Sequence, residues 1–239
     1  MWWKKDRTDK RPFVSAVIPA AGSSTRMGEE TNKLLIELDG MPVLARTLLV
    51  FERCPLVDEI VVACRESDIM PYARLCEAFG MQKVRQIVRG GGSRSESVLC
   101  GVKACAEQAD FVAIHDAARP LLRLDDLMRV IEDAAEHGAA CLVVPMKDSV
   151  KRVEDGWITA DVARASLAAA QTPQVFGRKK IQRALELVQA RGLAPTDDCA
   201  AAELAGMRVF ATLGSYTNIK VTTPEDLIVA EAFLQEAEG

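Results

Sequence analysis

Short apolar runs alternate with amphipathic stretches along this chain of 239 residues. The apolar runs predict strands that are buried on both faces, and the amphipathic stretches predict helices that bury one side. Glycine or a capping residue bounds several of the helices, as is usual at helix ends. The predicted strands span 13–19, 59–64, 83–88, 111–115, 140–145 and 208–213, and the predicted helices span 42–54, 67–79, 93–105, 124–137, 178–191, 198–205 and 224–236.

Alternation of strand and helix with short links predicts a doubly wound α/β fold around a mostly parallel sheet. The alternation breaks between residues 151 and 174, where Asp155-Gly156 separates two short runs with strand character. Asp-Gly is a strong turn signal for a two-residue β-hairpin. Since a hairpin this small buries no core of its own, we expect a protruding β-arm that packs on a partner subunit. The alternative is a surface hairpin without a partner.

Composition and charge narrow the class of protein. Hydrophobic residues make up 49% of the chain and charged residues 27%, enough for a sizeable core, and the net charge is −4. An acidic chain lacks the basic surface of a nucleic-acid-binding protein. The seven cysteines form no CxxC pair, so we expect reduced thiols and a cytoplasmic protein. No apolar run approaches the roughly 20 residues that span a bilayer, so no membrane contact is expected.

Residues with anion-binding character follow the first predicted strand. The small residues 20–25 let a backbone approach a ligand closely, and Arg26 and Lys33 add two cations. This loop is neither a GxGxxG dinucleotide fingerprint nor a Walker loop. It predicts a polyphosphate site of another kind, and the alternative is a solvated arginine in an ordinary turn.

Two later strands are also followed by residues that can bind a ligand. A glycine triplet, 90–92, follows the third predicted strand, and Asp116 and Arg119 follow the fourth. Because the carboxyl ends of parallel strands share one edge of a sheet, we expect these loops to converge there. Asp116 has two interpretations, a ligand of Mg²⁺ or of a substrate hydroxyl, and a helix cap or partner of Arg119. His115 is predicted to be structural.

Taken in order, these motifs resemble those of the 2-C-methyl-D-erythritol 4-phosphate cytidylyltransferase family, from about residue 13 to residue 234. The segments that carry the resemblance are 19–22, 26–28, Lys33, 91–94, 97–98, 115–120, Pro145, 147–149, Lys151, Arg164, 171–174, 196–198, 218–222 and 224–227. The resemblance implies one nucleotidyltransferase domain over 12–239, a loose tail over 1–11, and a dimerisation arm over 148–172 in a homodimer. It also implies the transfer of CMP from CTP to methylerythritol phosphate with Mg²⁺ as cofactor.

The resemblance further implies a role for each matching residue. The residues that neutralise or present phosphate would be Arg26, Lys33, Arg164 and Lys220. The residues that bind the nucleotide would be Ala20, Ala21, Gly22, Gly91, Gly92, Arg94, Ser97, Asp116 and Ala117. The residues that bind methylerythritol phosphate would be Asp116, Arg119, Ser149, Arg164, Thr172, Thr196, Asp197 and Lys220. No protein ligand of Mg²⁺ is assigned beyond Asp116, because the CTP phosphates would hold most of the ion.

The chain departs from the family pattern at a few positions. Asn32 and Leu34 flank Lys33 where the family typically has proline and glutamine, Ser149 replaces a common threonine, and Ala163 replaces a usual aspartate. None of these changes removes a cation assigned to catalysis. Two other functions stay open: a cytidylyltransferase for another polyol phosphate, such as ribitol 5-phosphate, and a non-catalytic nucleotide-binding protein on the same fold.

Overall fold

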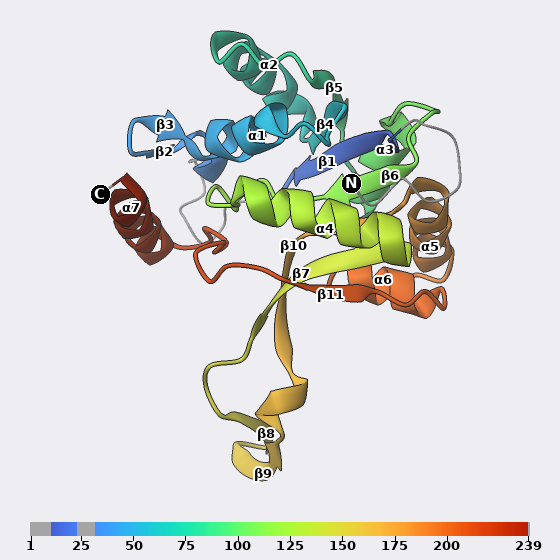
Figure 1. Cartoon of the computed structure of the whole chain (residues 1–239), viewed down its shortest axis with the longest axis vertical. Coiled ribbons are helices and arrows are strands. Elements are labelled where there is room, and N and C mark those ends of the chain that lie inside the picture. The colour runs from blue at the N-terminus through green and yellow to red at the C-terminus, as the bar shows by residue number, and fades with distance from the viewer. Residues whose placement is uncertain (1–10, 23–31, 239) are drawn as a thin grey trace.

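A seven-stranded sheet with the strand order β11-β7-β10-β6-β1-β4-β5 forms the centre of the molecule (Figure 1). The computed structural model describes residues 11–22 and 32–238. The strands of the sheet are β1 Val14–Ala20, β4 Glu59–Cys64, β5 Val84–Arg89, β6 Phe111–Ile114, β7 Ala139–Pro145, β10 Ala168–Gly177 and β11 Phe210–Leu213. Neighbouring strands are parallel except at β10, which runs antiparallel to both β6 and β7. The predicted α/β class with a mostly parallel sheet is therefore confirmed.

Helices cover both faces of the sheet, and each face has its own core. The helices are α1 Val43–Arg53, α2 Ile69–Ala78, α3 Arg94–Ala104, α4 Leu124–His137, α5 Arg178–Ala190, α6 Asp198–Leu204 and α7 Pro224–Glu238. In β1, Ala16 and Ile18 join the core under α1, α2 and α4, whereas Val17 joins the core under α3, α5 and α6. Successive side chains of a strand point to opposite faces, so an unbroken apolar run fills both cores.

Helix boundaries follow local chemistry. Ser93 caps α3, since its hydroxyl accepts a hydrogen bond from Glu96 N at 3.2 Å. Gly138 ends α4 with a φ of 89°, a left-handed conformation that glycine adopts without strain. None of the helices in the described part of the chain combines the length and the apolar character that a membrane crossing requires.

The strand β10 corrects the interpretation of residues 151–174 as a single excursion from the sheet. Residues 168–177 instead enter the centre of the sheet, where β10 pairs with β7 on one side and β6 on the other. The register shifts between Ala170 and Gln174, and the Thr172-Pro173 peptide bond in this interval is cis. The side chains of Thr172 and Gln174 are buried.

Only the middle of that segment stands away from the sheet. The strands β8 Val150–Glu154 and β9 Trp157–Val162 form an antiparallel hairpin, followed by the 3₁₀ turn η5 Arg164–Ser166. The predicted turn is confirmed, with positive φ at both Asp155 and Gly156. Figure 1 shows the hairpin projecting from the body at the ends of β7 and β10.

Four short elements complete the fold of the described residues. A 3₁₀ turn, η3, spans Lys33–Leu35, and a second, η4 at Glu66–Asp68, leads into α2. Between η3 and α1, β2 Glu37–Leu38 and β3 Met41–Pro42 form a two-stranded hairpin. The turn η3 returns the chain to the carboxyl edge of the sheet after β1.

Candidate active site

A cavity of about 410 Å³ opens at the carboxyl edge of the parallel strands. It is lined by Pro19, Ala20, Ala21, Gly22, Lys33, Leu34, Gly91, Gly92, Ser93, Arg94, Ser97, Asp116, Ala117, Ala118, Lys220 and Thr222. These residues come from the end of β1 and the loop after it, from the loop between β5 and α3 and the start of α3, from the loop after β6, from η3, and from the segment before α7. The expected convergence of the loops at one edge is therefore found, with a contribution from residues 220–222.

Asp116 is the electrostatic centre of this cavity. Its carboxylate lies 3.1 Å from Arg94 Nε, 3.6 Å from Arg119 Nε and 2.9 Å from Lys220 Nζ. Burial by itself raises the pKa of this carboxyl, but the neighbouring cations outweigh burial and hold the pKa well below its usual range. Asp116 is thus an anion that orients cations, and its side chain carries out the predicted pairing with Arg119.

Arg94 bridges Asp116 to a second carboxylate. Its Nη2 donates to Oδ2 of Asp198 at 2.8 Å, and the Asp198 side chain is buried. Burial raises the pKa of Asp198, whereas Arg94 opposes that rise. The guanidinium is therefore fixed between α6 and the loop after β6, with one edge exposed to the cavity.

His115 is enclosed in a chain of hydrogen bonds whose directions are fixed by their partners. The Arg119 carbonyl can only accept, so Nε2 of His115 donates to it across 3.1 Å. The Thr172 hydroxyl, 3.0 Å from Nδ1, then donates to the ring and accepts from Asp116 N at 3.1 Å. Burial lowers the pKa of His115 to about 4, so the ring is neutral at pH 7. Its position agrees with the prediction that His115 is structural.

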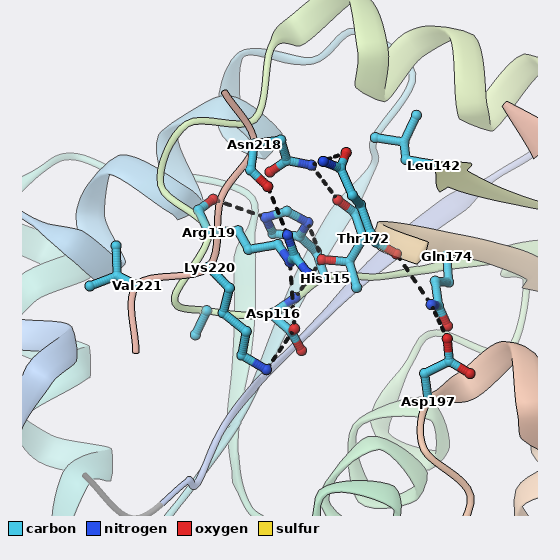
Figure 2. Close-up of polar contacts among 12 residues, drawn as sticks. His115, Asp116, Arg119, Leu142, Thr172, Gln174, Asp197, Asn218, Lys220 and Val221 are labelled. Carbon is cyan, nitrogen blue, oxygen red and sulfur yellow. Dashed lines mark hydrogen bonds and ion pairs between the residues drawn. The ribbon is translucent and has the colours of Figure 1, made fainter. Parts of the chain in front are cut away.

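A second set of hydrogen bonds ties β10 to the segments on either side of it (Figure 2). Asn218 Nδ2 donates to the Thr172 carbonyl at 2.8 Å, and the Asn218 carbonyl accepts from Arg119 Nη1 at 2.7 Å. On the other side, Gln174 Nε2 donates to Asp197 Oδ2 at 2.9 Å. Thr172 and Gln174 of β10, together with Asn218, therefore link the Asp116 loop to the beginning of α6.

The glycine loop before α3 is folded back on its own helix. Gly91 N donates to Ser97 Oγ at 3.1 Å, and Gly92 N donates to Glu96 Oε2 at 2.7 Å. A Cβ at Gly91 would lie 2.2 Å from Cβ of Glu96, so this close approach requires glycine. The loop presents a compact backbone edge to the cavity, beside Ala20 and Ala21.

Lys33 enters the cavity from the opposite side. Its Nζ donates to the Val221 carbonyl at 3.2 Å, next to Lys220, whose Nζ pairs with Asp116. Two cations that are far apart in sequence are thereby tied to one strand-like segment. Figure 2 shows Lys220 directed at Asp116 and Val221 beside it.

Several predicted residues do not join this group within the chain. Arg26 lies outside the described residues. Ser149 and Arg164 lie at the root of the arm, where Arg164 Nη1 donates to the Lys147 carbonyl, and Thr196 is exposed before α6. In the described part of the chain, no hydrogen bond or ion pair recorded for these residues reaches Asp116.

The residues around the cavity are poor ligands for a metal ion on their own. Asp116 is the only carboxylate among the described lining residues, and both of its oxygens face cations. Within residues 11–22 and 32–238, no group of three or more His, Cys, Asp or Glu side chains could hold a metal ion. The donor set fits Mg²⁺ only as an ion whose oxygen ligands come mainly from a bound triphosphate.

The match to a protein family extends over almost the whole described chain. Residues 14–236 match the model of the 2-C-methyl-D-erythritol 4-phosphate cytidylyltransferase family, IspD. This chain belongs to that family. A relative of that name from Geobacter metallireducens is 47% identical over 228 residues, which cover 93% of this chain and 98% of the relative. A second, from Geotalea uraniireducens, is 45% identical and covers 93% and 97% of the two chains.

Solved structures agree with this assignment. The crystal structure of 4-diphosphocytidyl-2C-methyl-D-erythritol synthase from Anaerococcus prevotii aligns with a TM-score of 0.84 and 32% identity. It covers 94% of this chain and 96% of its own. The 2-C-methyl-D-erythritol 4-phosphate cytidylyltransferase from Thermus thermophilus aligns with a TM-score of 0.77 and 29% identity, over 93% of this chain and 99% of its own. The chain therefore has the fold of these structures and belongs to a family of nucleotidyltransferases.

Three residues of the site received no individual role from the sequence. Asp198 fixes Arg94, Gln174 joins β10 to α6, and Asn218 joins β10 to the loop that carries Arg119. Each is polar yet buried, and a buried polar side chain needs a partner. A sequence pattern gives the residue type but not its burial. The only sequence signal for these three residues is that each lies within a motif of the family resemblance.

Proposed function

We propose that the chain transfers CMP from CTP to 2-C-methyl-D-erythritol 4-phosphate and releases pyrophosphate. A phosphate oxygen of the acceptor attacks the α-phosphorus of CTP, and the bond from that phosphorus to the bridging oxygen of the pyrophosphate leaving group breaks. The observation that carries this proposal is the meeting of Lys33 and Lys220 at a cavity whose one described carboxylate is already neutralised. Such a cavity suits the joining of two phosphate anions.

The residues act by neutralising negative charge on the phosphate groups rather than by transferring a proton. The attacking phosphate is already an anion near pH 7, so the reaction needs no strong base. Lys33 stabilises the charge that develops on the α-phosphate, and Lys220, held by Asp116, faces the acceptor phosphate. Because these cations are fixed before the substrates bind, little reorganisation is needed at the moment of transfer.

The nucleotide occupies the side of the cavity formed by the glycine loop. Ala20, Ala21, Gly91 and Gly92 leave room for a base and ribose. Ser97 stabilises the glycine loop, because its hydroxyl accepts a hydrogen bond from Gly91 N. Mg²⁺, when bound with the triphosphate, neutralises its charge and orients the α-phosphate. Among the described lining residues, Asp116 is the carboxylate that would help to hold such an ion, and it serves mainly to position Lys220.

The acceptor side is completed by a second copy of the chain. Ser149 and Arg164 lie on the arm, outside the cavity of their own chain. The arm carries the exposed side chains of Trp157 and Ile158, 78% and 69% accessible, which favours burial against another protein surface. In the proposed homodimer, the arm of one subunit brings Arg164 to the acceptor phosphate in the other.

An assay of pyrophosphate release tests the reaction and its acceptor. With CTP and Mg²⁺, we expect turnover with methylerythritol phosphate and little or none with ribitol 5-phosphate. Turnover only with ribitol 5-phosphate would assign the chain to a different acceptor. No turnover with either acceptor, for a folded protein that binds CTP, would favour a binding protein.

The same assay tests the role of Lys33. Lys33→Ala removes one preorganised cation, so kcat should fall by about 10²–10³ while CTP binding is largely kept. Lys103→Ala is the matched control, because Lys103 pairs with Glu186 on the surface between α3 and α5. Turnover of Lys33→Ala close to that of the control would refute the role assigned to Lys33.

A further inference from the structure

Asn32, directly before Lys33, is tied to a different part of the fold from the cavity itself. It is the N-cap of η3, and its Oδ1 accepts from Leu34 N at 3.2 Å. Its Nδ2 donates to Tyr72 Oη at 2.9 Å and to Asp68 Oδ1 at 3.2 Å. One side chain therefore connects the turn that carries Lys33 with the start of α2.

The chemistry of the partners fixes the orientation of the Asn32 amide. Leu34 N–H can only donate, so it must face the amide oxygen, and the Asp68 carboxylate can only accept, so it must face the amide nitrogen. In the reversed orientation, the amide nitrogen would face the Leu34 N–H and the amide oxygen would face the Asp68 carboxylate, so neither hydrogen bond could form. The observed orientation satisfies every partner at once, and Tyr72 Oη, 3.3 Å from Oδ1, can donate to the same oxygen.

The two anchors of Asn32 are themselves immobilised. The Tyr72 side chain is fully buried in the core between α2 and the sheet, and Asp68 is 7% exposed. Arg65 Nε donates to the other oxygen of Asp68 at 2.8 Å. Burial raises the pKa of Tyr72, which keeps its hydroxyl protonated and able to donate. Asn32 is therefore attached to a rigid part of the molecule.

We propose that Asn32 is a positioning residue for Lys33. By fixing the N-cap of η3 against Tyr72 and Asp68, it sets where the Lys33 ammonium lies relative to Val221 and the cavity. This inference rests on the proposed function, because it concerns how the cation of that reaction is held. Asn32 touches no substrate in this scheme and acts only through its neighbour.

A double-mutant cycle tests this proposal. Asn32→Ala should lower kcat by roughly 10- to 100-fold, because a misplacement of about 1 Å has costs of that size. Residues that act as one unit give non-additive losses. In the Lys33→Ala background, Asn32→Ala should therefore change kcat by less than about twofold. If it lowers kcat by the same factor in both backgrounds, Asn32 acts independently of Lys33 and the proposal is wrong.

Two further variants separate positioning from general stability. Val188→Ala removes buried methyl groups from the core under α5, far along the chain from η3, and should lower the melting temperature with kcat unchanged. Tyr72→Phe removes one hydroxyl, leaves the ring in the core, and should lower kcat only where Lys33 is present. It serves in place of Asn32→Ala should that variant fail to fold. Wild-type kcat in Tyr72→Phe and Asn32→Ala would overturn the proposal.

The cycle also distinguishes the two levels of inference. If Lys33→Ala itself retains wild-type kcat, the catalytic role of Lys33 fails and the positioning role fails with it. If Lys33→Ala is impaired but the loss from Asn32→Ala persists in its background, only the positioning role fails.

Discussion

His115 illustrates how a single buried side chain can set the geometry of a charged loop without taking part in the chemistry. Its two ring nitrogens are occupied by Thr172 and by the Arg119 carbonyl, on either side of Asp116. The ring also packs against Phe51, with a distance of 5.2 Å between ring centroids. Because the imidazole is buried and neutral, its burial lowers the stability of the folded protein only at a pH where the unfolded chain would protonate it.

We expect the stability of the protein to depend on the charge of His115 in mild acid. The pKa of His115 is lowered from 6.5 to about 4, so between these values the unfolded chain binds a proton that the folded chain does not. Stability is therefore complete near pH 7, falls as the pH drops through this window, and loses on the order of 3 kcal/mol from this group. Urea unfolding between pH 7.5 and 4.5 measures the slope.

His115→Gln is the matched variant for that experiment. Glutamine can accept from Thr172 with Oε1 and donate to the Arg119 carbonyl with Nε2, but it does not titrate. The variant should therefore show a shallower loss of stability between pH 6.5 and 4. An unchanged slope would mean that other groups cause the acid sensitivity.

Among the elements, β10 and α6 are joined to one another by hydrogen bonds. Asp197 caps α6, since its Oδ1 accepts from Ala200 N at 2.8 Å, and its Oδ2 accepts from Gln174 of β10. Gln174 Oε1 in turn accepts from Cys199 N at 2.9 Å. The beginning of this helix is thus defined by a strand as well as by its own cap.

Removing the cap should destabilise the protein by a measurable amount. Asp197→Ala loses the bond from Ala200 N, while Gln174 keeps its bond to the Gln171 carbonyl. We expect the free energy of unfolding to fall by about 1–2 kcal/mol. Asp197→Ser keeps a capping oxygen and should lose clearly less. If Asp197→Ala unfolds at the same urea concentration as the wild type, the cap contributes nothing.

The same elements show what sequence patterns could and could not predict. The strand 59–64 contains the unbroken apolar run 60–64, so its position and burial follow from the sequence alone. The strand β10 has no such run, because residues 171–174 (Gln-Thr-Pro-Gln) interrupt it, and proline is unusual inside a central strand. Its place in the sheet depends on pairing with β6 and β7, which no local signal encodes.

The site was predictable to a similar extent. Ligands bind beyond the carboxyl ends of parallel strands, and this rule predicted the edge of the sheet where the site lies. Residues 20–22, 91–94 and 116–117 line the cavity there. The choice of partners was not predictable, because Arg94 meets Asp198 across a separation of 104 residues. Such pairs depend on the finished packing of both α3 and α6 against α5.

At the scale of the whole molecule, the arm is the feature that a single chain does not explain. The hairpin β8–β9 is mostly exposed, and it projects from the body rather than packing on it (Figure 1). A two-stranded hairpin of this size is only marginally stable by itself. Its exposed apolar side chains and the position of Arg164 beside it have a common explanation in the proposed homodimer.

Mixing two inactive variants tests whether the arm completes a neighbouring site. Lys33→Ala and Arg164→Ala should each be nearly inactive. If the two residues serve one site from different subunits, a mixed dimer contains one intact site, and an equal mixture should regain about a quarter of wild-type activity after subunit exchange. A mixture as inactive as its components, with exchange shown by a labelled subunit, would place both residues in the site of one chain.

The segment that carries Lys220 and Val221 determines when the site can assemble during synthesis of the protein. The loops after β1, β5 and β6 leave the ribosome well before this segment. Lys220 pairs with Asp116, and Val221 holds Lys33, only after the arm, β10 and α6 have all been synthesised. A chain that ends before residue 220 lacks both contacts, so the cavity is complete only after this late segment has been synthesised.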